Sequence, residues 1–271
     1  MFAAALIVFR EALEAALIIT IIMAATRGVR HRGLWVSLGM AGGVIGAGLV
    51  AALTDIISTL FQGTGQEIVN AVILFLAVGL ISWHIVWMNS HGRQLAEEMR
   101  AIGKSVSEGE KHLSILALVV GLAVMREGSE IVLMLQGLWS TGDKTAMLGG
   151  GLLGLGAGVV VSCLMYLGFL ALSIKRVFAL TNAFLMLIAA GMAARAANFL
   201  VQADILPSLT PRMWDTSNIL SDQSRVGEFF AALVGYIAKP NGIEVLFYGV
   251  TVVFVLLMMQ YAKKHASSAK A

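Results

Sequence analysis

Long apolar runs recur along the whole chain, and short polar stretches separate them. Most runs approach the roughly 20 residues that an α-helix needs to cross a bilayer, so the pattern predicts membrane-spanning helices. The predicted helices cover residues 2–25, 34–60, 69–88, 113–138, 146–173, 178–202 and 243–261. The fold class that follows is an all-α integral membrane protein with seven transmembrane helices.

Two connections are longer than the others. In residues 89–112, Leu95, Met99, Ile102 and Val106 recur at helical spacing, with charged residues between them. This pattern predicts an amphipathic helix that lies either at the membrane interface or packed on the inner face of the protein. The second long connection, residues 204–242, is predicted to be an external loop.

Composition agrees with a membrane protein and leaves little room for a soluble domain. The chain is 58% hydrophobic and 13% charged, with a mean hydropathy of +0.86, whereas soluble domains carry roughly 25% charged residues. The first apolar run contains Arg10, Glu11 and Glu14 and lacks a basic start. We therefore interpret it as a mature span and not as a targeting peptide. Cys163 is the single cysteine, which excludes an internal disulfide and a cysteine-based metal cluster.

The basic residues indicate the orientation. Of the 19 Lys and Arg residues, 12 fall in one set of alternate connections, 4 in the other set, and 3 inside predicted helices. Because cytoplasmic loops are enriched in Lys and Arg, the N-terminus is predicted outside and the C-terminus in the cytoplasm. A multi-pass protein of the inner (cytoplasmic) membrane follows. This asymmetry explains the pI of about 9.1, so the expected partner is the lipid bilayer and no nucleic acid.

A charged motif occurs twice, 116 residues apart. Arg-Glu-x-x-Glu stands at Arg10–Glu14 and again at Arg126–Glu130, and a glycine-rich helix follows each copy. The copies lie in the first and fourth predicted helices, so their helices cross in opposite directions. This indicates a 3+3 inverted-topology repeat with one further helix. The predicted parts are repeat A (1–90), a cytoplasmic amphipathic loop (91–112), repeat B (113–203), the external loop (204–242) and a last helix (243–261).

The motif predicts a cation site. A charge at the centre of a membrane helix costs roughly 2.5–3.5 kcal/mol, so six unpaired charges would cost on the order of 15–20 kcal/mol. In each motif the Arg and the second Glu are four residues apart and can pair, but one arginine cannot neutralise two carboxylates. All four glutamates are expected at one depth near the midplane; they are Glu11, Glu14, Glu127 and Glu130. Their oxygens suit Fe³⁺ and, less selectively, Fe²⁺ or Mn²⁺.

These motifs resemble the signature of the high-affinity iron permease family, which includes oxidase-coupled iron permeases of fungi and bacterial iron-uptake permeases. The family carries Arg-Glu-x-x-Glu in the first and fourth of seven helices. Trp214–Ser217, Leu220–Asp222 and Gly235–Tyr236 are similar to its last external loop, so the resemblance covers nearly the whole chain. It implies movement of Fe²⁺ or Fe³⁺ with the motif glutamates as ligands, and iron as transported substrate with no permanently bound cofactor. It also implies an external oxidase, peroxidase or iron-binding protein as partner.

Several other polar residues are secondary candidates. Arg195 and Asn198 lie in the outer half of the sixth predicted helix, and Arg195 is expected to balance the glutamates together with Arg10 and Arg126. A buried arginine usually pairs with a carboxylate, which is the reason for this expectation.

The remaining candidates have a favoured structural interpretation. His84 lies near the predicted cytoplasmic end of its helix between two tryptophans, which favours an interfacial aromatic belt over a role as an exit ligand. Asp55 ends the second predicted helix, where an interfacial acid is favoured. Asp222 and Glu244 belong to the outer loop region, where acids either attract cations to an entrance or form a solvated face.

Two alternatives to iron transport stay open. Carboxylates discriminate poorly among cations, so a transporter of another divalent metal such as Mn²⁺ or Pb²⁺ is the first. A membrane-bound di-iron enzyme is the second, although such enzymes use Glu-x-x-His pairs that this chain lacks. We therefore predict that the protein is not an enzyme.

Overall fold

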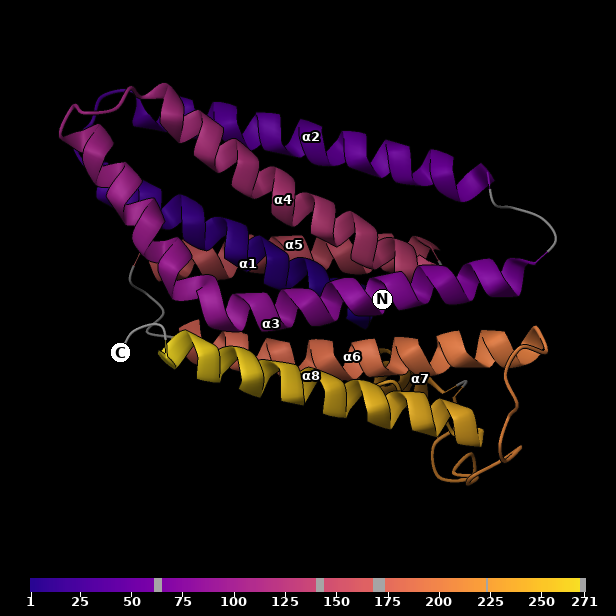
Figure 1. The fold of residues 1–271 in the computed structure, drawn as a ribbon. Helices are drawn as coiled ribbons and strands as arrows, with labels where there is room; N and C mark the ends of the chain where they lie inside the picture. Colours follow the sequence, from indigo (N-terminus) through magenta and orange to yellow (C-terminus); the bar gives the residue numbers. More distant parts are fainter. Residues whose placement is uncertain (61–64, 140–143, 168–173, 223, 269–271) are drawn as a thin grey trace.

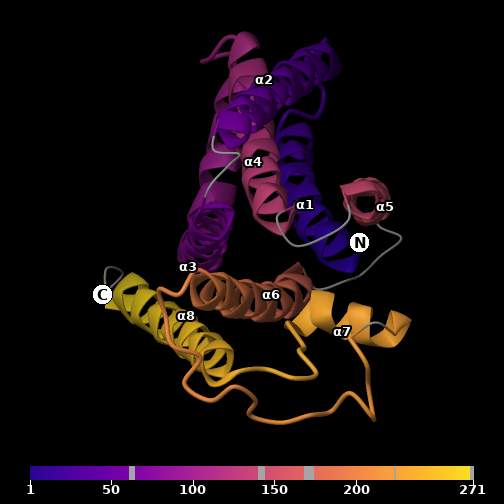
Figure 2. The same cartoon turned by 90° about the vertical axis from the view of Figure 1, so that its right-hand side faces the viewer.

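The computed structural model describes residues 1–60, 65–139, 144–167, 174–222 and 224–268, and within these ranges it contains helices and no strand. The chain folds into a bundle of long, roughly aligned helices with one short helix beside it (Figures 1 and 2). The elements are α1 Phe2–Ala25, α2 Arg32–Leu60, α3 Gln66–Ser107, α4 Ser114–Trp139, α5 Lys144–Tyr166, α6 Ile174–Gln202, α7 Arg225–Val234 and α8 Gly242–Ser268.

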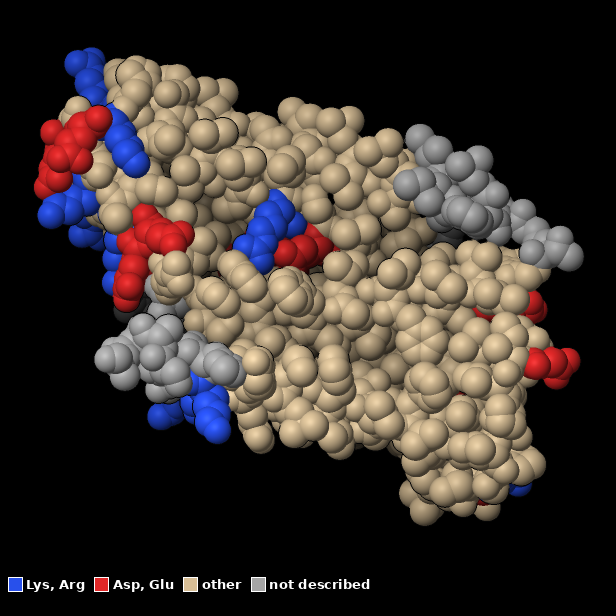
Figure 3. Space-filling model, viewed as in Figure 1, with Lys and Arg blue, Asp and Glu red and all other residues tan. Residues whose placement is uncertain are grey.

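Five of the described helices are long and apolar enough to cross a membrane. These spans are Arg32–Thr54, Gln66–Gly92, Thr145–Leu164, Arg176–Gln202 and Gly242–Lys264. The two other long helices, α1 and α4, each carry one charged motif in an otherwise apolar sequence. Several spans in one chain make this a multi-pass membrane protein. Charged side chains gather toward the ends of the bundle and leave a broad uncharged belt between them (Figure 3).

The predicted amphipathic segment is helical, but it is not a separate element. It forms the second part of α3, a single helix of 42 residues. Its apolar face points inward: Met99 and Val106 are buried and pack with Ile22 of α1 and Leu116 of α4. Of the two predicted positions, the structure has the one packed on the protein itself.

The glycine-rich helix α2 packs closely along α4. A Cβ built at Gly39 would lie 2.5 Å from the carbonyl oxygen of Ala117, and one at Gly43 would lie 2.7 Å from that of Gly121. The contacts advance in the same direction along both helices, so α2 and α4 are parallel. Helices approach this closely where glycine removes the side chain.

The second glycine-rich helix, α5, repeats this arrangement on α1. Added Cβ atoms at Gly150 and Gly154 would collide with the carbonyl oxygens of Met1 and Ala5. One at Gly158 would lie 2.8 Å from the Cβ of Ala12. Each glycine-rich helix therefore packs on the motif helix of the other half, and Figure 1 shows that α1 and α4 run in opposite directions.

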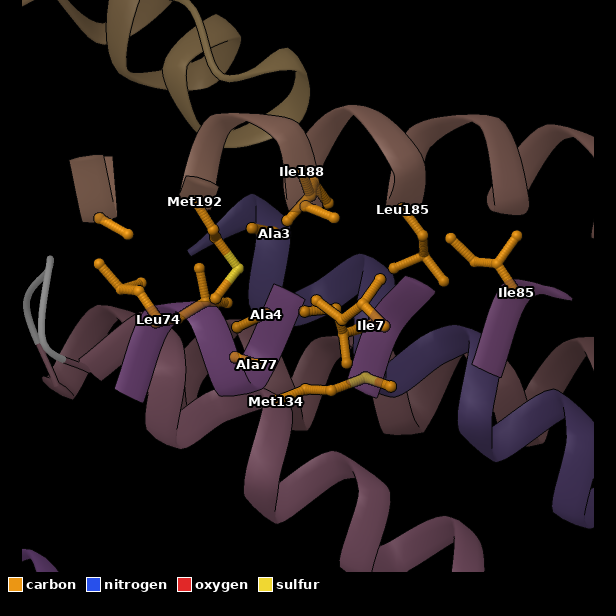
Figure 4. Close-up of a cluster of buried hydrophobic side chains, with 14 of the residues drawn as sticks. Ala3, Ala4, Ile7, Leu74, Ala77, Ile85, Met134, Leu185, Ile188 and Met192 are labelled. Carbon is orange, nitrogen blue, oxygen red and sulfur yellow. The ribbon is translucent and has the colours of Figure 1, made fainter. Parts of the chain in front are cut away.

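Two apolar clusters hold the bundle together. The Ile7 cluster joins α1, α3, α4 and α6 near the N-terminus of α1 (Figure 4); it includes Ala3, Ala4, Ile7, Leu74, Ala77, Ile81, Met134, Leu185, Ile188 and Met192. The Ile22 cluster joins the other end of α1 to α2, α4 and the second part of α3; it comprises Ile18, Ile22, Val36, Met99, Val106, Leu116 and Val120.

Helix α7 lies within the segment predicted as an external loop. Ser224 caps its first turn by accepting a hydrogen bond from the Gly227 N–H at 2.9 Å. At its other end, Gly235 adopts φ +70° and lies so near Gly191 that a Cβ on either would be 2.5 Å from the other's Cα. Because Gly191 is near the middle of α6, the end of α7 packs against the side of this helix and not beyond its end.

Candidate metal centre

The two motifs lie between the two apolar clusters. Along α1, the Arg10–Glu14 turn follows Ile7 of one cluster and precedes Ile18 of the other. Along α4, the Arg126–Glu130 turn lies between Val120 and Met134 in the same way. The charged side chains therefore form one polar layer, with apolar packing on both sides of it along the bundle axis.

The motif of α1 is fully enclosed. Arg10 has no exposed surface, and Glu11 and Glu14 are 0% and 2% exposed. The guanidinium of Arg10 pairs with both carboxylates, Nη1 with Glu11 Oε1 at 2.9 Å and Nη2 with Glu14 Oε1 at 2.6 Å. One oxygen of each carboxylate thereby pairs with Arg10, and the other oxygen does not.

The motif of α4 is partly open. Nε of Arg126 donates to Glu130 Oε1 at 3.0 Å, and the guanidinium lies over the Trp87 ring with Cζ 4.1 Å from its centroid. The side chain of Arg126 is 37% exposed and that of Glu130 is 21% exposed, whereas Glu127 is buried. A single charged spot accordingly interrupts the uncharged belt in Figure 3.

His84 joins the polar layer, which corrects the sequence interpretation. The residue is 2% exposed, with Nδ1 in contact with Glu130 Oε2 and Nε2 3.4 Å from Glu14 Oε2 and 3.6 Å from Glu11 Oε2. An interfacial position is wrong because α3 continues well past its predicted end at residue 88, so His84 is interior to the helix. Its neighbour Trp83 is 70% exposed and occupies the outer surface instead.

His84 and three of the motif glutamates converge closely, and Glu14 adjoins them through its contact with His84. Glu11, His84, Glu127 and Glu130 each offer one atom within 4.8 Å of the others. Within the described residues, Oε2 of Glu11, Glu14 and Glu127 is buried and has no hydrogen-bond partner. Buried polar atoms are normally paired, so these three carboxylate oxygens are candidate ligands for a cation. With all four carboxylates ionised, two guanidinium groups leave the layer two negative charges.

Arg195 does not belong to this layer. Its acidic neighbours are Asp222 and Glu244, so it balances the outer segment and not the central glutamates as the sequence suggested. Asn198, on the same helix, accepts a hydrogen bond from Asn241 Nδ2 at 3.2 Å. The outer half of α6 is therefore fastened to the chain that leads into α8.

The acidic secondary candidates have structural contacts. Glu244 and Asn241 cap α8 reciprocally: Glu244 Oε2 accepts from the Asn241 N–H at 2.8 Å, and Asn241 Oδ1 accepts from the Glu244 N–H at 2.8 Å. Asp222 accepts from the Ala238 N–H at 2.9 Å. Asp55 lies in α2, and its side chain is outside the described residues.

Comparisons with known proteins match nearly the whole chain to one family. Residues 1–266 match the iron permease FTR1 family. The ferrous iron permease EfeU of Escherichia coli O6:H1 is 30% identical over 250 residues, which cover 90% of each chain. The ferrous iron permease EfeU of Yersinia pestis is 29% identical over 262 residues, 95% of this chain and 93% of that one. No solved structure matches the chain.

Proposed function

Because the chain belongs to the iron permease FTR1 family, we propose that it carries iron, as Fe²⁺, across a membrane through the polar layer between α1 and α4. The relatives are named ferrous iron permeases, and the polar layer offers carboxylate oxygens and an imidazole to a divalent metal. The single observation that carries the proposal is the convergence of the two motifs with three unpaired carboxylate oxygens.

In this proposal α1 and α4 also cross the membrane. They are excluded from the five apolar spans by their charged motifs, and those charges face each other inside the bundle. Together with the matched packing of α2 on α4 and α5 on α1, this supports a 3+3 inverted repeat followed by α8. The outward N-terminus, the cytoplasmic membrane and an external oxidase, peroxidase or iron-binding partner stay predictions from the sequence.

Iron uptake into proteoliposomes tests the proposal. We expect Glu14→Gln and Glu127→Gln to lower Fe²⁺ uptake by at least about tenfold, since each removes a charged oxygen ligand. Glu97→Gln, which changes an exposed glutamate of α3, is the matched control and should transport as the wild type does. Equal uptake by all four proteins would exclude the polar layer as the route.

The same assay addresses the identity of the ion. Carboxylates alone separate divalent metals weakly, so Mn²⁺ and Pb²⁺ are added as competitors of Fe²⁺. Uptake of Mn²⁺ or Pb²⁺ in preference to Fe²⁺ would replace iron as the substrate while leaving the site in place.

A further inference from the structure

Among the described residues, His84 is the one nitrogen ligand that the polar layer offers besides the two guanidinium groups, which cannot bind a cation. Its two ring nitrogens face different halves of the protein. Nδ1 contacts Glu130 of α4, and Nε2 faces Glu14 and Glu11 of α1. A helix that carries neither motif therefore links both motifs through one imidazole ring.

The contacts of Glu130 determine which ring nitrogen is available. Oε1 of Glu130 accepts from Arg126 and Oε2 meets His84 Nδ1, so both oxygens have partners. A metal-binding histidine typically donates its other ring N–H to a carboxylate, which fixes the tautomer and turns the free nitrogen toward the metal. In that arrangement Nδ1–H donates to Glu130, and Nε2 presents its lone pair.

The lone pair on Nε2 points at oxygens that have no partner. The nearest are Oε2 of Glu14 at 3.4 Å and Oε2 of Glu11 at 3.6 Å, both buried and unpaired. When Nδ1–H donates to Glu130, the one lone pair of a neutral imidazole faces these oxygens, and a cation bound among them removes the repulsion. The Glu127 Oε2 is a further unpaired acceptor of the same layer.

Building on the proposed transport, we propose that His84 Nε2 is a metal ligand together with Glu11, Glu14 and Glu127, and that Glu130 orients His84 and does not bind the ion. One imidazole among carboxylates suits a divalent transition metal such as Fe²⁺. Mg²⁺ and Ca²⁺ take oxygen ligands, and Mg²⁺ gives up its water reluctantly. His84 thus makes an acidic site prefer transition metals over the abundant alkaline-earth ions.

Electron spin echo spectroscopy of Mn²⁺ bound to the full-length protein tests the assignment, because a coordinated imidazole nitrogen modulates the echo. We expect the modulation in the wild type and in His91→Gln, whose substituted histidine is exposed, and its loss in His84→Gln. A wild type without nitrogen modulation, or His84→Gln that retains it, would overturn the ligand role.

Competition during transport separates a ligand from a residue that supports the fold. We expect His84→Gln to reduce the preference for Fe²⁺ over Ca²⁺ by about 10- to 100-fold, whereas a purely structural role would lower both fluxes equally. If Fe²⁺ does not cross with the wild type, the proposed transport fails; if it crosses without nitrogen coordination, the role of His84 fails. The two results are therefore distinguishable.

Discussion

Single residues of the two motifs differ in environment although their sequences match. Arg10 is completely buried between two carboxylates, and Arg126 is 37% exposed over Trp87. Removing one member of a buried ion pair leaves an uncompensated charge and costs about 3–5 kcal/mol. The Arg126–Glu130 pair is only partly buried, so removing Arg126 should cost less. The same substitution should therefore have unequal effects at the two positions.

Arg10→Gln is expected to destabilise the protein strongly and Arg126→Gln weakly. Thermal unfolding in a mild detergent measures the difference, with the wild type and the two variants at equal concentration. We expect the midpoint of Arg10→Gln to fall clearly below that of Arg126→Gln. Equal shifts would mean that Arg10 is more hydrated than its burial indicates.

At the same scale, the sequence singled out the four glutamates and named His84 only as a secondary candidate with an interfacial position favoured. Charge in an apolar helix is a direct signal, and the doubled spacing placed Glu11, Glu14, Glu127 and Glu130 at one level. The predicted end of the helix at residue 88 favoured an interfacial position for His84. The helical periodicity of its neighbours was a better indication that His84 is buried. Ala77, Ile81, His84 and Ile85 share one helical face, and this face is buried.

At the scale of elements, buried positions of α3 and α6 share a constant spacing in the sequence. The buried positions Leu74, Ile81 and Ile85 of α3 each lie 111 residues before the buried positions Leu185, Met192 and Ala196 of α6. By the same spacing, His84 corresponds to Arg195. Helix α3 thus contributes an imidazole to the polar layer, whereas α6 places a guanidinium group near Asp222 and Glu244.

The element boundaries show what a local pattern can predict. The five apolar spans were predicted because length and hydropathy alone identify them. The continuity of α3 was missed because polar residues after residue 88 suggested a loop. In the structure Met99 packs inward, and the segment continues the helix. Helix α7 had signals at both ends, the N-cap Ser224 and Gly235 after its last turn, but the family resemblance suggested an external loop.

Neighbouring glycines of α2 give a matched pair for testing the α2–α4 contact. A side chain at Gly43 would press on Gly121 and Val124, whereas one at Gly42 would meet no atom within 4 Å. We expect Gly43→Leu to cost about 1–3 kcal/mol or more through overpacking and Gly42→Leu to be tolerated. Size-exclusion profiles and thermal unfolding of both variants compare them. A tolerated Gly43→Leu would mean that α2 and α4 are not tightly packed.

At the scale of the whole molecule, two apolar clusters enclose one charged layer. The Ile7 cluster closes one side, where Phe2 also meets Phe229 of α7 with ring centroids 4.7 Å apart, and the Ile22 cluster closes the other. The exposed surface of Arg126 and Glu130 is a lateral opening in this enclosure. This overall arrangement could not be predicted from the sequence. The two motifs are equivalent in the sequence, and their exposures differ only once the helices have packed.

The charge of the polar layer has an electrical consequence. With four carboxylates ionised, His84 neutral and two arginines present, the empty layer would carry two negative charges, and one bound Fe²⁺ would neutralise it. The membrane potential would then act little on the loaded protein and strongly on the empty one, by about 2.3 kcal/mol per charge per 100 mV across the full membrane. An inside-negative voltage would drive the empty site outward, ready for the next ion. We expect such a voltage to speed repeated Fe²⁺ uptake by proteoliposomes while leaving a single turnover unchanged; a voltage-independent steady rate would contradict this charge count.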